Sequence, residues 1–172
     1  FETQGAEFDL DLPVSETLPG PGIAGFYTKS WPAEQTPGLH LQVQQVSARG
    51  DCLFQSIAIG LAHACGYRHL SMYAPCLKTD SRTLRKLAVD TLKTDCDLFM
   101  QEDEMISTRE LAEVASEQFN CTPAQYLEDM LRPATWGGGP EIVALANALR
   151  RPIHVYEPIC SKDNKTLRFE LC

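Results

Sequence analysis

Hydrophobic residues recur three and four positions apart through much of the chain, which is the spacing of an amphipathic helix. Three helix starts carry a capping residue: Ser81, Ser107 in a Ser-Thr-Arg-Glu capping box, and Thr122 followed by a proline. Another helix is expected after the Gly137–Gly139 turn, where Pro140 precedes an apolar stripe. The pattern therefore predicts helices over residues 53–63, 81–92, 107–118, 122–132 and 140–149.

Strict alternation of apolar and polar residues marks the expected strands. Leu39, Leu41 and Val43 alternate with polar residues in the segment 39–47, and similar alternation occurs at 152–157 and 166–171. A long helical block is thus followed by the beginning of a small sheet. This order indicates an α+β or α/β fold with much helix.

Residues 1–38 differ from the rest of the chain because they hold five prolines and five glycines. Neither helical nor strand periodicity runs through them, so they are interpreted as a linker or an irregular arm. Phe26, Tyr27 and Trp31 could still pack onto the domain. The expected organisation is a Pro/Gly-rich arm over 1–38 and one domain over 39–172.

Charge and composition narrow the classes of function. The 172 residues carry 15 basic and 23 acidic side chains, a net charge of −8. Such a chain repels phosphate backbones, which excludes generic nucleic-acid binding and favours a positively charged partner. No window approaches the roughly 20 apolar residues of a membrane span, so no membrane segment is predicted. Seven cysteines without a regular pattern indicate reduced thiols of an intracellular protein, cytoplasmic or nuclear.

Cys52 is the strongest candidate for chemistry. Gly50 and Asp51 form a turn that delivers this cysteine to the N-terminus of a predicted helix. Free backbone N–H groups and the helix dipole stabilise a thiolate there, and the same N–H groups can hold an oxyanion. The alternative interpretation is a small, buried, inert cysteine.

A second group of candidate ligands lies within 14 positions: His63, Cys65, His69 and Cys76. Imidazole and thiolate groups suit zinc, which would make the chain a small metal-binding interaction domain. Their spacing matches no common zinc signature, so we expect a helix end and a loop without a metal.

Three blocks of sequence resemble the ovarian tumour (OTU) family of cysteine proteases. Gly50–Ala58, GDCLFQSIA, resembles the nucleophile motif, and Trp136–Glu141, WGGGPE, resembles the Trp-Gly-Gly-x-x-Glu motif. Arg151–Tyr156, RPIHVY, resembles the strand that follows in that family. The blocks stand in the family's order, and the resemblance covers about residues 43–172.

The resemblance implies an α+β, papain-like fold with a small sheet between helical lobes. It implies a deubiquitinase, which hydrolyses the isopeptide bond after the C-terminal glycine of ubiquitin or of a polyubiquitin chain. Cys52 would be the nucleophile, and Gly50 and Asp51 would belong to the oxyanion loop. Trp136, Gly137, Gly138 and Glu141 would support the site as a packing turn under an aromatic ring. No cofactor or metal is required.

The chain departs from the family pattern in two places. Arg49 stands where members carry an Asp three positions before the nucleophile, in the loop that shapes the oxyanion hole. The family's general base is a His on a later strand, which we expect beyond Cys172, with the C-terminal strands cut short. His154 falls in the earlier strand and is either a strand-face residue or a substitute base. Both departures also fit an alternative function, an inactive OTU-like module that binds ubiquitin.

Overall fold

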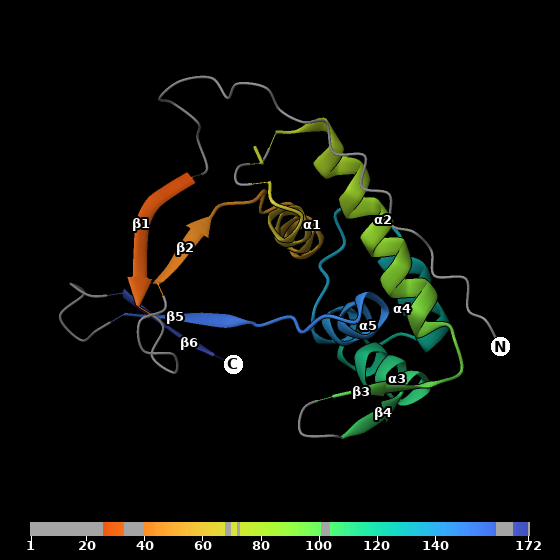
Figure 1. Cartoon of the computed structure of the whole chain (residues 1–172). Coiled ribbons are helices and arrows are strands. Elements are labelled where there is room, and N and C mark those ends of the chain that lie inside the picture. The colour runs from red at the N-terminus through yellow and green to blue at the C-terminus, as the bar shows by residue number, and fades with distance from the viewer. Residues whose placement is uncertain are drawn as a thin grey trace.

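Helices and strands alternate irregularly along the chain in the computed structural model, which describes residues 26–32, 40–67, 70–71, 73–100, 104–160 and 167–171 (Figure 1). In chain order the elements are β1 (Phe26–Pro32), β2 (His40–Gln44), α1 (Cys52–Ala64), α2 (Pro75–Leu92), β3 (Asp97–Phe99), β4 (Met105–Ser107), α3 (Thr108–Gln118), α4 (Pro123–Met130), α5 (Gly139–Leu149), β5 (Tyr156–Cys160) and β6 (Leu167–Leu171).

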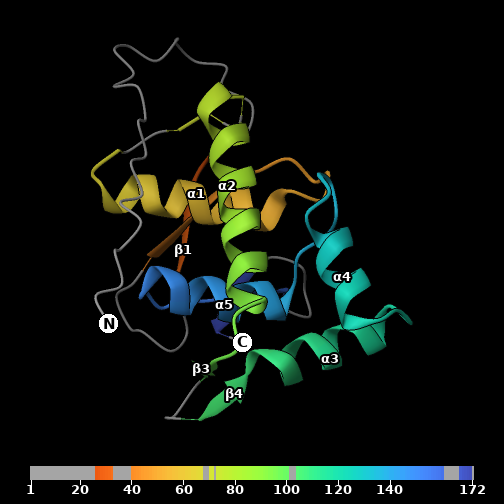
Figure 2. The ribbon, with the colours of Figure 1, turned by 90° about the vertical axis from the view of Figure 1, so that its right-hand side faces the viewer.

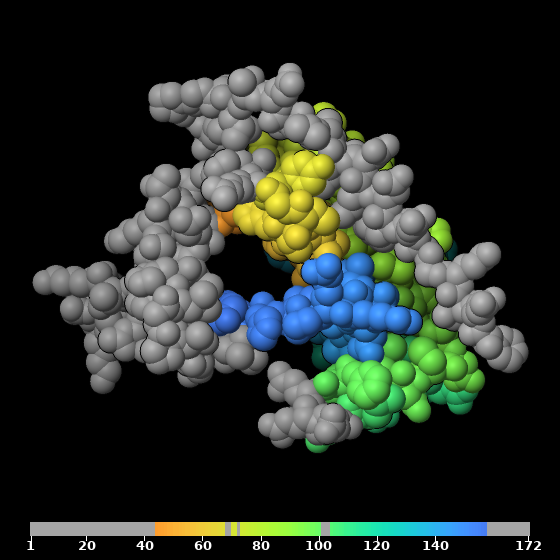
Figure 3. All heavy atoms as spheres, in the orientation of Figure 1, coloured from red at the N-terminus to blue at the C-terminus, as the bar shows by residue number. Residues whose placement is uncertain are grey.

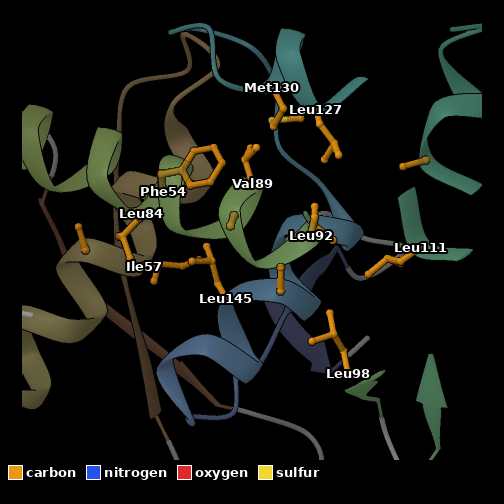
Figure 4. Close-up of a cluster of buried hydrophobic side chains, with 14 of the residues drawn as sticks. Phe54, Ile57, Leu84, Val89, Leu92, Leu98, Leu111, Leu127, Met130 and Leu145 are labelled. Atoms are coloured by element: carbon orange, nitrogen blue, oxygen red, sulfur yellow. The ribbon is translucent and has the colours of Figure 1, made fainter. Parts of the chain in front are cut away.

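Helix α2 is the centre of the helical part. It packs on α1 and α5 and also reaches α3 and α4; Figure 2 shows it crossing both α1 and α5. Its inward side chains join residues of α1 and α5 in one hydrophobic cluster, in which Phe54, Leu84 and Leu145 are fully buried (Figure 4). Burial of such side chains is worth about 1.5–3 kcal/mol each. The N-terminal turn of α1 is therefore anchored in the core through Phe54.

The described strands form three antiparallel pairs: β1 with β2, β3 with β4, and β5 with β6. Strand β1 also lies against β6, so two of the pairs meet beside the helices (Figure 1). The segment between α5 and β5 extends away from the helical body to reach them (Figure 3). The chain thus combines helices with small sheets, as the α+β assignment predicts.

The predicted starts of α3 and α4, each marked in the sequence by a capping residue, are confirmed. Ser107 accepts a hydrogen bond from the Glu110 backbone N–H, and Thr122 accepts one from that of Gln125. The buried side of α4 carries Tyr126, Leu127 and Met130. In α3, Ala112 is buried, whereas Val114 is 49% exposed.

The predicted start of α2 at Ser81 is wrong. The helix begins at Pro75, whose fixed φ angle suits a first helical position. Ser81 is buried inside the helix, and its hydroxyl donates to the carbonyl oxygen of Lys78. A serine can satisfy its hydroxyl on the preceding turn as well as at a cap, so residue type alone did not locate the boundary.

Two predictions about strands are also corrected. Phe26–Pro32 is a strand rather than irregular arm, because pairing with β2 supplies its backbone hydrogen bonds; an irregular register between Phe26 and Ser30 obscures its alternation. Strand β5 begins at Tyr156, so Ile153 and His154 precede it. The rest of the predicted arm, residues 1–25 and 33–38, lies outside the described residues. Within the described part of the chain, no helix is long and apolar enough to cross a membrane.

Candidate active site

Cys52 is the first residue of α1, and its side chain is half-buried. The first hydrogen bond of the helix runs from the Gln55 N–H to the Asp51 carbonyl oxygen. Within the described ranges, the N–H groups of Cys52, Leu53 and Phe54 have no hydrogen-bond partner. The thiol therefore lies beside a set of unpaired donors, which is the environment that stabilises negative charge.

Gly50 allows the loop before Cys52 to approach a second loop. Its φ angle is +84°, and a Cβ there would collide with the backbone of Ala134, whose Cα would be 2.6 Å away. Ala134 itself has a φ of 66°, which is unusual for a residue with a side chain. Two residues with positive φ angles, Gly50 and Ala134, are thus in contact where the two loops meet.

The two loops are joined by Arg85 of α2, whose side chain is 2% exposed. Its Nη2 donates to the carbonyl oxygens of Gly50 (3.2 Å) and Thr135 (2.8 Å) and to the Asp51 carboxylate (2.5 Å). Its Nη1 donates to the Met130 carbonyl oxygen at 2.9 Å. One buried cation therefore binds the loop before Cys52, the end of α4 and the loop that follows α4.

The core also supports this guanidinium. Its central carbon lies 4.3 Å from the centre of the Phe54 ring, a cation–π contact. The Asp51 carboxylate, which also accepts from the Ala134 N–H at 3.4 Å, compensates its charge. A buried arginine is tolerated only with such partners.

The second predicted motif lies against the first turn of α1. A Cβ on Gly137 would come within 2.9 Å of a Leu53 methyl carbon and 3.0 Å of the Phe54 ring, so only glycine fits without repacking. Trp136 is 60% exposed and does not form the aromatic cap expected from the sequence. A Cβ on Gly138 would instead point into open space, with no heavy atom beyond its chain neighbours within 4 Å. Of the three glycines, it is Gly137 that packs on α1.

Glu141 fixes the start of α5. Its side chain is fully buried, and its carboxylate accepts from the Tyr126 hydroxyl at 2.6 Å and from the Gly138 N–H at 2.7 Å. Burial raises the pKa of the Glu141 carboxyl, while these hydrogen bonds and the charge of Arg85 act in the opposite direction. Burial and the nearby Glu141 also raise the pKa of Tyr126. This pair ties α4 to the Gly-rich loop.

The candidate histidines and thiols are not brought together. His63 is exposed on the last turn of α1, and His154 is exposed near the Tyr156 ring. No hydrogen bond connects a described histidine side chain to Cys52. His69 lies outside the described residues, and no group of three potential metal ligands occurs among those that are described.

Arg85 and Tyr126 are the contributors that sequence reasoning missed. Arg85 stands within the apolar stripe of α2, between Leu84 and Ala88. A single arginine in such a stripe is the signal that could have identified a buried charge with a structural task.

Comparison with known proteins decides the family. The family described as OTU-like cysteine protease matches residues 47–170. The chain belongs to this family. Its site therefore lies within an OTU-like domain, and the two motif loops joined by Arg85 are both inside the matched region.

A curated relative gives the same result. The chain is similar to the protein named Ubiquitin thioesterase otu2 of Schizosaccharomyces pombe (strain 972 / ATCC 24843), with 30% identity over 128 residues. The alignment covers 73% of this chain and 36% of the relative, so the chain spans about a third of the relative's length. No solved structure matches.

Gly50 and Gly138 provide a matched test of the loop contact. Gly50→Ala should lower the free energy of unfolding by roughly 2 kcal/mol or more, because the added Cβ meets the Ala134 backbone at a positive φ. Gly138→Ala should change it by less than about 0.5 kcal/mol, since that position is open. Thermal and denaturant unfolding measure both, and equal effects of the two changes would contradict the assigned contact.

The variant Glu141→Gln tests whether folding raises the pKa of the buried Glu141 carboxyl, because the stability difference between the two proteins then depends on pH. A pKa raised by folding means that the native state binds the proton more tightly than the unfolded chain. The stability of the wild type relative to Glu141→Gln should therefore fall as pH rises from the usual value of 4.5 through the raised pKa, and stay constant below that window. Urea unfolding at several pH values measures this difference; a difference that grows with pH would show that the carboxyl is instead stabilised as the anion.

Proposed function

We propose that this chain is the catalytic region of a deubiquitinase, a thiol hydrolase that cleaves isopeptide bonds after the C-terminal glycine of ubiquitin. The observation that carries the proposal is the position of Cys52, at the start of α1 beside unpaired N–H groups and within an OTU-like domain. The name of the relative, a ubiquitin thioesterase, supports ubiquitin as the substrate.

The proposed reaction has two steps. The Cys52 sulfur attacks the carbonyl carbon of the ubiquitin glycine, and the N–H groups at the start of α1 stabilise the oxyanion. The carbon–nitrogen bond breaks, the lysine amine leaves with the proton that the Cys52 thiol has lost, and a thioester remains on Cys52. Water then hydrolyses the thioester and releases the ubiquitin carboxylate and the thiol.

His63 is too far from Cys52 to be the base that takes its proton. It lies on the last turn of α1, about 16 Å along the helix axis from Cys52. Cys76 is a poorer candidate for the nucleophile on different grounds: burial and the Asp80 carboxylate raise the pKa of its thiol, which disfavours the thiolate. Of these two cysteines, Cys52 has the surroundings that suit the chemistry better.

The finer fold and the cellular setting are proposed with the activity. The β1–β2 and β5–β6 pairs, which touch through β1 and β6, would form the small sheet of a papain-like arrangement beside the helices. An intracellular location, cytoplasmic or nuclear, is supported by the free thiols of Cys52, Cys65, Cys76, Cys96 and Cys121. The acidic net charge would favour approach of a basic partner surface.

Cys52→Ala in the full-length protein should reduce cleavage of diubiquitin by at least about 10³-fold, because the nucleophile is lost. Cys65→Ala is the matched control: it lies at the C-terminal cap of the same helix, where the dipole disfavours negative charge, and should cleave normally. Cys121→Ala should also retain activity. A gel assay of diubiquitin cleavage measures all three.

Retention of full activity by Cys52→Ala would refute the assignment of the nucleophile. A wild-type protein that binds ubiquitin but cleaves no chain would instead support the inactive ubiquitin-binding module. The observation that favours this alternative is Arg49, which stands in the nucleophile loop where family members carry an Asp.

A further inference from the structure

Helix α1 lacks a side-chain cap although its N-cap residue is an aspartate, one of the best capping residues. The same chain caps two other helices in the ordinary way: Ser107 accepts from the Glu110 N–H at 3.1 Å, and Thr122 accepts from the Gln125 N–H at 3.2 Å. The missing cap is therefore a local property of Asp51.

The Asp51 carboxylate is engaged elsewhere. Its Oδ1 lies 2.5 Å from Nη2 of Arg85, so it is directed toward α2 rather than over the first turn of α1. The backbone differs as well: ψ is 4° at Asp51, against 145° at Ser107 and 155° at Thr122, and capping requires the extended form. Contact with Arg85 and this backbone angle both keep Asp51 from the helix amides.

Arg85 also orients the peptide bond before Cys52. Its Nη2 binds the carbonyl oxygen of Gly50, and the Gly50–Asp51 peptide is trans. In a trans peptide the carbonyl and the following N–H point in opposite directions. The N–H of Asp51 is therefore directed away from the guanidinium.

We propose that Arg85 is a positioning residue for the thiol chemistry: by holding and neutralising Asp51, it keeps the N–H groups beside Cys52 available for the substrate oxyanion. This proposal rests on the proposed function. Without Arg85, no ion pair holds the Asp51 carboxylate toward α2. Asp51 can then take the extended backbone form of Ser107 and Thr122, in which its carboxylate accepts from those N–H groups. In either form it is an uncompensated negative charge next to a developing negative charge. Both effects oppose the same transition state.

The test is a pair of variants in the full-length protein. Arg85→Met should lower kcat for diubiquitin by roughly 10- to 100-fold, the order lost with an oxyanion donor, and change KM by less than about threefold. Arg85→Met with Asp51→Ala should regain at least about fivefold in kcat, because the competing carboxylate is gone. Arg82→Met, the same substitution at an exposed position of α2, is the control and should behave as wild type.

If Arg85 only stabilised the fold, removing Asp51 as well would not restore activity. A higher kcat in the double variant than in Arg85→Met is therefore specific to the proposed role. If the double variant is as slow as Arg85→Met or slower, the proposal is wrong. If Arg85→Met fails to fold, Arg85→Gln with and without Asp51→Ala replaces it, because glutamine keeps an N–H donor for the carbonyl oxygens and reduces the cavity.

Amide hydrogen exchange separates this proposal from the proposed function, since it needs no turnover. In the Arg85 variant, exchange of the Leu53 and Phe54 amides should slow by roughly fivefold as Asp51 caps them, and adding Asp51→Ala should restore the wild-type rate. An inactive wild type with this exchange pattern would refute only the activity, whereas unchanged exchange in the Arg85 variant would refute the role of Arg85.

Discussion

The site depends on one buried guanidinium. Arg85 donates to three backbone carbonyl oxygens and one carboxylate, which come from the loop before Cys52, the end of α4 and the segment after it. Irregular loops have few regular backbone partners, so their polar groups must be satisfied individually when they are buried. A guanidinium has five donors in a fixed plane, against three on a lysine ammonium, so it can serve all four of these acceptors at once.

This constraint explains why two motifs more than 80 positions apart meet at one place. Arg85 brings the Gly50 carbonyl and the Thr135 carbonyl to the same guanidinium, and the glycines remove the side chains that would hold the loops apart. Glu141 then fixes the other end of the second loop at the start of α5. Cys52 is thus positioned by core packing and by a buried polar network rather than by its own loop alone.

The features predicted correctly from the sequence are those determined by residues close together in the chain. Ser107 and Thr122 carry complete capping signals, and the motif around Cys52 places the thiol at a helix start. The predictions that needed tertiary contacts were incomplete. Nothing local distinguishes Gly137, which packs on Phe54, from Gly138, which is open. Likewise, β1 lacks alternation of its own and is a strand because β2 pairs with it. Arg85 is an ordinary helix residue until its acceptors, which lie 34 to 50 positions away, are known.

The central claim is that Cys52 and the unpaired amides of α1, kept free of Asp51, form one reactive site. The most direct measurement is a crystal structure of the full-length protein bound to ubiquitin whose C-terminal glycine is an aldehyde. We predict a hemithioacetal on the Cys52 sulfur, with its oxygen within hydrogen-bond distance of N–H groups at the start of α1 and with Asp51 still paired to Arg85. An adduct on another cysteine, or an oxygen directed away from these amides while Asp51 caps them, would contradict it.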